Sequence, residues 1–266
     1  MPSRTAKSTL LAAFVWAISL SYGFSDWGIY RQELVGAGDA WKQYLHGGIA
    51  APWQYRIGPW VVADWMNRLF HLKPYNTLAL LDVLCLALAL WVMLTVLRKS
   101  DRYRTALPGT RWLAIAGSLF LAEYYLAWGH WYQASDTVPS ILFVALSLAL
   151  IDGRIVRSKL LACLLLVVLA GIQGFLRADV AVVLHAGFFL VAISGAKISI
   201  PLGRAWQAVT SLLAALLAGC VQLYLILIKF PHAKYGPGGV FRLTTNVHPG
   251  MWLTMLLGLF PFCLLL

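Results

Sequence analysis

Side chains that could carry chemistry gather in short polar segments between long apolar runs. The segment GDAWKQYLHGGIAAPWQYRIGPW, residues 38–60, places Asp39 and Arg56 among three Trp, and Glu33 precedes it. A carboxylate such as Asp39 or Glu33 can act as a general base on a hydroxyl, and Arg can hold a phosphate leaving group through two hydrogen bonds. These residue types suit transfer of a phosphate-activated group, but no spacing here is diagnostic of a reaction.

Two later segments add further candidates. His130 and Asp136 lie in EYYLAWGHWYQASDTVPS, and Arg177 and Asp179 lie in GFLRADV. Each has a structural alternative. Asp136 precedes an apolar run with an early Pro, which is also the pattern of a helix N-cap. Arg177 and Asp179 can pair with each other, Arg56 lies among aromatic residues as at many membrane interfaces, and Asp39 can be a solvated loop acid.

The composition indicates what kind of scaffold must position these residues. The chain has 266 residues, of which 61% are hydrophobic and 12% charged, against about 25% charged in soluble domains. A helix needs about 20 apolar residues to cross a bilayer. We therefore expect an all-α, polytopic transmembrane helix bundle, one domain over 1–266, with about eight spans: 8–24, 75–97, 112–128, 137–151, 160–176, 180–195, 206–229 and 251–266.

The first polar loop is expected over residues 25–73. Its apolar stretch 53–72 is interrupted by Arg56, Asp64 and Arg68, which predicts a helix lying along the membrane surface and not across it. The final run MWLTMLLGLFPFCLLL has no basic flank or polar tail. Either the chain ends within the membrane or it is part of a longer protein, and this pattern favours the second.

The distribution of charge predicts the orientation. Lys and Arg near the spans favour the cytoplasmic side, and an N-terminus on that side places 12 of the 21 bases there. Six of the ten acids then fall outside: Asp26, Glu33, Asp39, Asp64, Asp136 and Asp179. The net charge of +11 is thus explained by topology, so we expect membrane lipids and no nucleic acid as partners.

Other polar groups in the apolar runs have structural interpretations. The four Cys show no metal-binding or CxxC spacing and are expected to be buried thiols. Asp82 lies inside a span and should face protein or water, with a base on a neighbouring helix as its expected partner. No cofactor is predicted, and a divalent metal is compatible with the acids but not indicated by their spacing.

Three segments together resemble bacterial membrane proteins related to the GT-C glycosyltransferases. PWQYRIGPWVVADWM resembles the YRxLxPxL segment of those proteins, ASDTVPSILFVALSLALID their DxPxxLFxxLxLxL span, and GIQGFLRADVAVVL their LxxLxRETxxxL segment. Order and spacing agree over roughly residues 10–195. The first loop lacks the paired acids of the family, and Ala178-Asp179 stands where the family has Glu-Thr.

The resemblance implies an enzyme of the bacterial inner membrane that transfers a sugar from a polyprenyl-phosphate carrier on the extracytoplasmic face. Asp39 would be the catalytic base. Arg56 would contact the carrier phosphate or support the structure, and Asp136 and Arg177 would be motif residues. We group Asp179, His130 and Glu33 with them as candidate substrate-binding residues.

Two other classes stay open. A transporter or lipid flippase without chemistry would use polar residues such as Asp82 to line a path. A structural membrane subunit would use its polar loops to bind another protein. Convergence of Asp39, Arg56, Asp136 and Arg177 on one external cavity would favour the enzyme, and scattering would favour the subunit.

Overall fold

The predicted all-α class is confirmed for the part of the chain that the structure describes. This computed structural model describes residues 4–35, 38–49, 51, 53–99, 105, 107, 109, 134–153, 155–156, 158–194 and 202–233. The long helices are α1 (Arg4–Leu34), α4 (Pro74–Lys99), α7 (Ala134–Ile151), α8 (Lys159–Ile193) and α9 (Arg204–Tyr224), which continues as the π-helical turn η3 (Leu225–Lys229). The short elements are η1 (Ala40–Lys42), α2 (Gln43–His46), η2 (Trp53–Tyr55) and α3 (Gly58–Phe70).

Three helices among the described residues are long and apolar enough to cross a membrane. They are Pro74–Lys99, Lys159–Ile193 and Arg204–Lys229, and Ser135–Ile151 is a shorter apolar helix. Together with the composition they indicate a membrane protein. The predicted spans 112–128 and 251–266 lie outside the described residues.

The long helix α8 reverses direction at Arg177, whose φ of −144° and ψ of 78° are not helical. Along the first half, Lys159 lies near Gly203 and Gly174 near Val221, so this half runs parallel to α9. In the second half, Phe188 accepts a hydrogen bond from Gln207 near the start of α9, so the direction is opposite. The two halves correspond to the predicted runs 160–176 and 180–195, joined by a very short turn.

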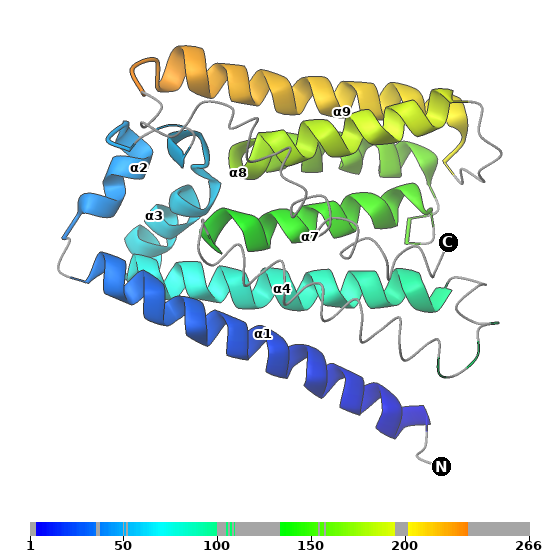
Figure 1. Ribbon diagram of the computed structural model, residues 1–266, viewed down its shortest axis with the longest axis horizontal. Coiled ribbons are helices and arrows are strands. Elements are labelled where there is room, and N and C mark those ends of the chain that lie inside the picture. The colour runs from blue at the N-terminus through cyan, green and yellow to red at the C-terminus, as the bar shows by residue number, and fades with distance from the viewer. Residues whose placement is uncertain are drawn as a thin grey trace, which may run out of the picture.

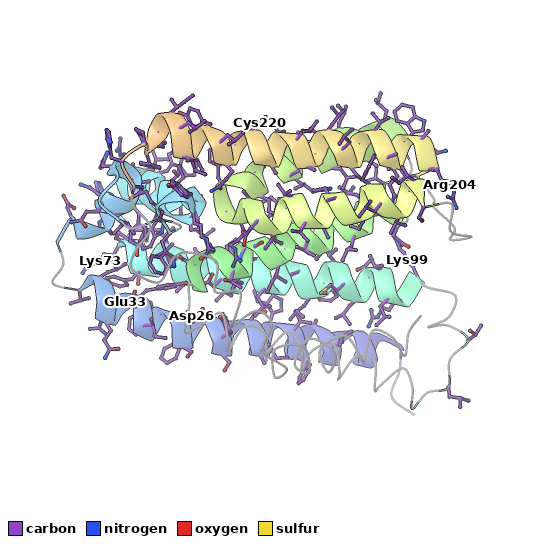
Figure 2. The ribbon with its side chains drawn as sticks, turned by 45° about the horizontal axis from the view of Figure 1, so that its top comes forward. Asp26, Glu33, Lys73, Lys99, Arg204 and Cys220 are labelled. Carbon is purple, nitrogen blue, oxygen red and sulfur yellow. The ribbon has the colours of Figure 1, made fainter. Side chains whose placement is uncertain are left out.

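The helices lie side by side in the order α1, α4, α7, α8 and α9 (Figure 1). Apolar clusters hold each neighbouring pair together. One joins Val15 of α1 to Leu86 of α4 and Val138 of α7, and another joins Leu150 of α7 to Leu166 of α8. The elements α2 and α3 cover one end of this row, while Lys99 and Arg204 mark the other end (Figure 2).

The first helix continues beyond the predicted span of 8–24 as far as Leu34. This extension forms because it has its own buried face: Tyr30 packs with Trp41 and Trp60 from the following loop and with Leu78 of α4. Residues 25–34, which were predicted as the start of the polar loop, therefore belong to α1. The rest of the loop folds back over the ends of α1 and α4.

Candidate functional site

The polar loop that opened the sequence is a folded cap on the end of the bundle. The Gln54 side chain is fully buried; it accepts a hydrogen bond from the Ile49 amide at 2.8 Å and donates one to the Tyr44 carbonyl at 2.6 Å. The Tyr44 ring stacks on Trp60 of α3 with 3.9 Å between ring centroids. These contacts fix the path of the chain through residue 56 and so determine where Arg56 points.

Arg56 reaches from this cap to the first turn of α7. Its Nη1 lies 3.0 Å from Oδ2 of Asp136, whose side chain is only 2% exposed. The predicted N-cap position of Asp136 is wrong, because α7 already includes Ala134 and Asp136 lies within its first turn. Asp136 therefore serves as the inner partner of an ion pair and not as a cap.

The reversal in α8 brings a second Arg to the same carboxylate. The Nε of Arg177 lies 3.8 Å from Asp136 Oδ2. Arg177 also forms a bidentate pair with Asp179, at 3.0 Å from Nε and 2.7 Å from Nη2. The predicted pairing of Arg177 with Asp179 is thus confirmed, and Arg177 also lies within ion-pair distance of Asp136 on α7. We call Arg56, Asp136, Arg177 and Asp179 the ion-pair cluster.

Burial and charge act in opposite directions on Arg56. Burial lowers the pKa of its guanidinium, the Asp136 carboxylate opposes this, and the nearby Arg177 charge adds to the lowering. The Arg stays charged, because its ordinary pKa lies far above neutral pH. The cluster therefore joins the cap to α7 by a charge-assisted hydrogen bond, which is stronger than a neutral one, and α8 to α7 by the longer 3.8 Å ion pair.

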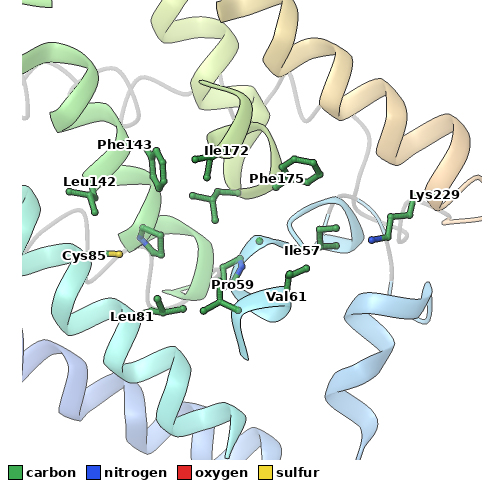
Figure 3. A pocket seen from close by; sticks show the side chains of 14 residues that line it. Ile57, Pro59, Val61, Leu81, Cys85, Leu142, Phe143, Ile172, Phe175 and Lys229 are labelled. Carbon is green, nitrogen blue, oxygen red and sulfur yellow. The ribbon is translucent and has the colours of Figure 1, made fainter. Parts of the chain in front are cut away.

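An apolar cavity of about 510 Å³ adjoins the cluster (Figure 3). Its walls come from α3, α4, α7, the first half of α8 and the end of η3, and include Ile57, Val61, Leu81, Phe143, Ile172 and Lys229. Ile57 directly follows Arg56 in the chain, and Leu176, another wall residue, directly precedes Arg177. The volume lies in the usual range for a small-molecule site.

Close packing at Gly58 forms one edge of this cavity. A Cβ at Gly58 would come within 2.6 Å of Leu176 Cδ2 and 3.2 Å of the Phe175 carbonyl. Only a residue without a side chain lets α3 approach the turn of α8 this closely. The contact thus keeps the cavity wall beside the ion-pair cluster.

Four of the seven predicted site residues meet in the ion-pair cluster, namely Arg56, Asp136, Arg177 and Asp179. Asp39 is exposed in the cap, where Lys42 lies 2.7 Å from its carboxylate. Glu33 is exposed near the end of α1. His130 lies outside the described residues. The roles of Asp39, Glu33 and His130 remain predictions.

The expected basic partner of Asp82 is replaced by a hydroxyl and a second acid. Tyr30 of α1 donates a hydrogen bond to Asp82 Oδ2 at 2.8 Å, and Asp26 of the same helix is a neighbouring acid. Both Asp side chains are fully buried. The sequence placed Asp26 in the loop because the apolar run ends near residue 24, but α1 carries it inward against α4.

Within the described residues, no three His, Cys, Asp or Glu side chains lie close enough together to hold a metal ion. Comparisons with protein-family models, with curated proteins and with solved structures give no match to the chain. Functional interpretation therefore rests on the geometry of this end of the bundle.

Sequence reasoning missed the cavity and Lys229, the one charged residue among the described residues that line it. A signal was available: Lys229 ends an apolar span on the side predicted to face outside, against the usual bias of bases toward the cytoplasm. The cavity itself had no local signal, since its walls come from five separate elements.

Proposed function

We propose that the chain is a GT-C-like integral membrane protein that binds a polyprenyl-phosphate-linked sugar at the capped end of the bundle and transfers the sugar there. The observation that carries this proposal is the apolar cavity beside the ion-pair cluster, whose central carboxylate, Asp136, is buried. A ligand with a long apolar chain matches this cavity, and its charged headgroup would then lie at the capped end of the bundle. The cavity and the cluster support the proposal of a sugar transferase.

The rim of the cavity also suits entry from a bilayer. Val61 and Ile172 are each 46% exposed although both are apolar and line the cavity. In a membrane such side chains would face lipid, so an apolar chain could enter sideways without crossing water. Lipid is accordingly the medium from which the substrate would come.

In the proposed reaction an acceptor hydroxyl attacks the anomeric carbon of the sugar. The bond from that carbon to the phosphate oxygen breaks, polyprenyl phosphate leaves with the bonding electrons, and a carboxylate takes the hydroxyl proton. Asp39 is our candidate for this base, from its place in the first external loop. Its exposure lets an acceptor from water reach it.

The test is sugar transfer by the full chain in proteoliposomes, from a polyprenyl-phosphate sugar labelled in the sugar. We expect labelled product from the wild type and a large loss with Asp39→Asn, while Asp64→Asn, an acid of α3 paired with Arg68, keeps activity. Full activity of Asp39→Asn excludes Asp39 as the base. Absence of product with every donor sugar tried, while the lipid still binds, favours a binding or transport role.

A lipid flippase without chemistry is the second candidate. It is favoured by the cavity open at its apolar rim and by the buried carboxyls Asp26 and Asp82 between α1 and α4. A flippase would move the labelled lipid between leaflets and leave its sugar attached. The same proteoliposomes distinguish the two, since the enzyme changes the chemical form of the label and the flippase changes only its side.

For the topology we propose about eight spans, a cytoplasmic N-terminus in a bacterial inner membrane, and α3 lying along the outer surface. Two features support this orientation. Lys99 and Arg204 lie at the end of the row opposite the cap (Figure 2), and α3 exposes Val62, Trp65 and Phe70 along one side. Labelling of single Cys introduced at residues 33 and 99 with an impermeant reagent should mark opposite sides of the membrane.

A further inference from the structure

The ion-pair cluster has no spare positive charge for an anionic ligand. Arg56 is paired with Asp136, and Arg177 is paired with Asp179 in a bidentate contact and also lies near Asp136. Two Arg and two Asp sum to zero. A phosphate that approached these Arg would have to compete with carboxylates already bound to them, so a headgroup needs another cation.

Lys229 supplies such a cation at the cavity itself. It is the one charged residue among the described residues that line the cavity, and Figure 3 shows its ammonium turned toward Ile57. Among the described residues, no carboxylate lies within ion-pair distance of Lys229. Its one aromatic contact places Nζ 5.4 Å from the centre of the Phe230 ring. The charge of Lys229 is therefore available.

The local backbone fixes Lys229 in this position. The chain leaves α9 through a π-helical turn, closed by a 2.9 Å hydrogen bond from the Phe230 amide to the Leu225 carbonyl. Leu225 and Phe230 are buried against Tyr55 and Ile57 of the cap. Such wide turns are uncommon and often occur at functional sites. Here the turn is anchored on both sides of Lys229, while Lys229 itself stays exposed.

We propose that Lys229 binds the phosphate of a single-chain lipid phosphate whose apolar chain lies in the cavity, and that the ion-pair cluster supports the wall of this site without binding the phosphate. The inference rests on the lipid ligand of the proposed function and assigns its headgroup contact. Charge complementarity carries it: an ammonium with no carboxylate partner among the described residues meets an anionic headgroup, and the other described residues of the wall are apolar. An ammonium suits this contact, since Lys commonly binds phosphate as a point charge.

The test measures binding of farnesyl phosphate, of farnesol and of inorganic phosphate to the full chain in detergent micelles. Lys229→Met removes the charge at similar length, and Lys229→Arg keeps it. Lys73→Met is the matched control, because Lys73 lies at the same end of the row with its Nζ 5.9 Å from the Tyr75 ring centre but does not line the cavity.

We expect Lys229→Met to weaken farnesyl phosphate binding about tenfold or more, as for loss of one charge-assisted contact. Farnesol binding should not change, and Lys229→Arg and Lys73→Met should resemble the wild type. Equal loss with Lys73→Met, or no loss with Lys229→Met, overturns the role of Lys229 while the lipid site of the proposed function stands. A wild type that binds inorganic phosphate alone, or neither lipid, overturns both.

Discussion

The buried pair between Arg56 and Asp136 gives the sharpest test of the site's construction. At 3.0 Å, with an effective dielectric constant of about 20, the attraction between the two charges is about 5.5 kcal/mol. Removing one partner of a buried pair typically costs about 3–5 kcal/mol, because the other charge stays buried without compensation. The Arg56 side chain is 19% exposed, so we expect a value at the lower end, about 3 kcal/mol, for Asp136→Asn.

The assay is a double-mutant cycle on the free energy of unfolding. Arg56→Met, Asp136→Asn and the double variant are unfolded with SDS in mixed micelles and followed by Trp fluorescence. We expect the double variant to lose clearly less than the sum of the single losses, with a coupling of about 2 kcal/mol. The control is the Arg68–Asp64 pair of α3, at 2.8 Å but with the Arg side chain 72% exposed.

For this exposed pair we expect a coupling below about 0.5 kcal/mol. The comparison isolates burial, since both pairs join an Arg to an Asp at nearly the same distance. If the coupling of Arg56 with Asp136 is no larger than that of the control pair, the cluster does not fasten the cap to α7. The reasoning about the site would then fail at its first step.

Three further predictions address packing and the cavity. Gly174→Val should destabilise the fold by about 1–3 kcal/mol, since even a Cβ would lie 2.9 Å from Val221 Cβ. Gly219 has open space around it, so Gly219→Ala should be neutral or stabilising in the same SDS titration. Tyr30→Phe should cost about 1–2 kcal/mol, from loss of its hydrogen bond to Asp82, and an unchanged unfolding midpoint would contradict that bond. Val61→Trp should fill the cavity from its exposed rim and weaken farnesol and farnesyl phosphate equally in the binding assay; selective loss of the phosphate would refute the placement of the chain.

The sequence predicted the helices better than the contacts between them. The runs 75–97 and 206–229 form helices because their apolar residues leave few alternatives in a membrane. The reversal at Arg177 was also visible, as a short polar break between two apolar runs. These features depend on local composition, which a sequence shows directly.

Which acid meets which base could not be predicted in the same way. Asp39 and Asp136 look alike in sequence, yet Asp136 is the one held by Arg56, because Gln54 and Trp60 set the path of the cap. Lys229 is positioned by a π-helical turn, which no residue pattern in the sequence predicts. Asp26 was predicted in a loop, because no residue near it in the sequence indicates that the packing of Tyr30 extends α1 to Leu34.

The position of α7 within the row has a mechanical consequence. It packs against α4 on one side and α8 on the other, and the cavity opens along this seam. The ion-pair cluster joins α7 to α8 and to the cap at one end of the cavity, so a ligand that moves α7 away from α8 must work against those contacts. Ligand binding in the cavity and formation of the ion pairs are then thermodynamically linked. Each changes the equilibrium constant of the other by the same factor.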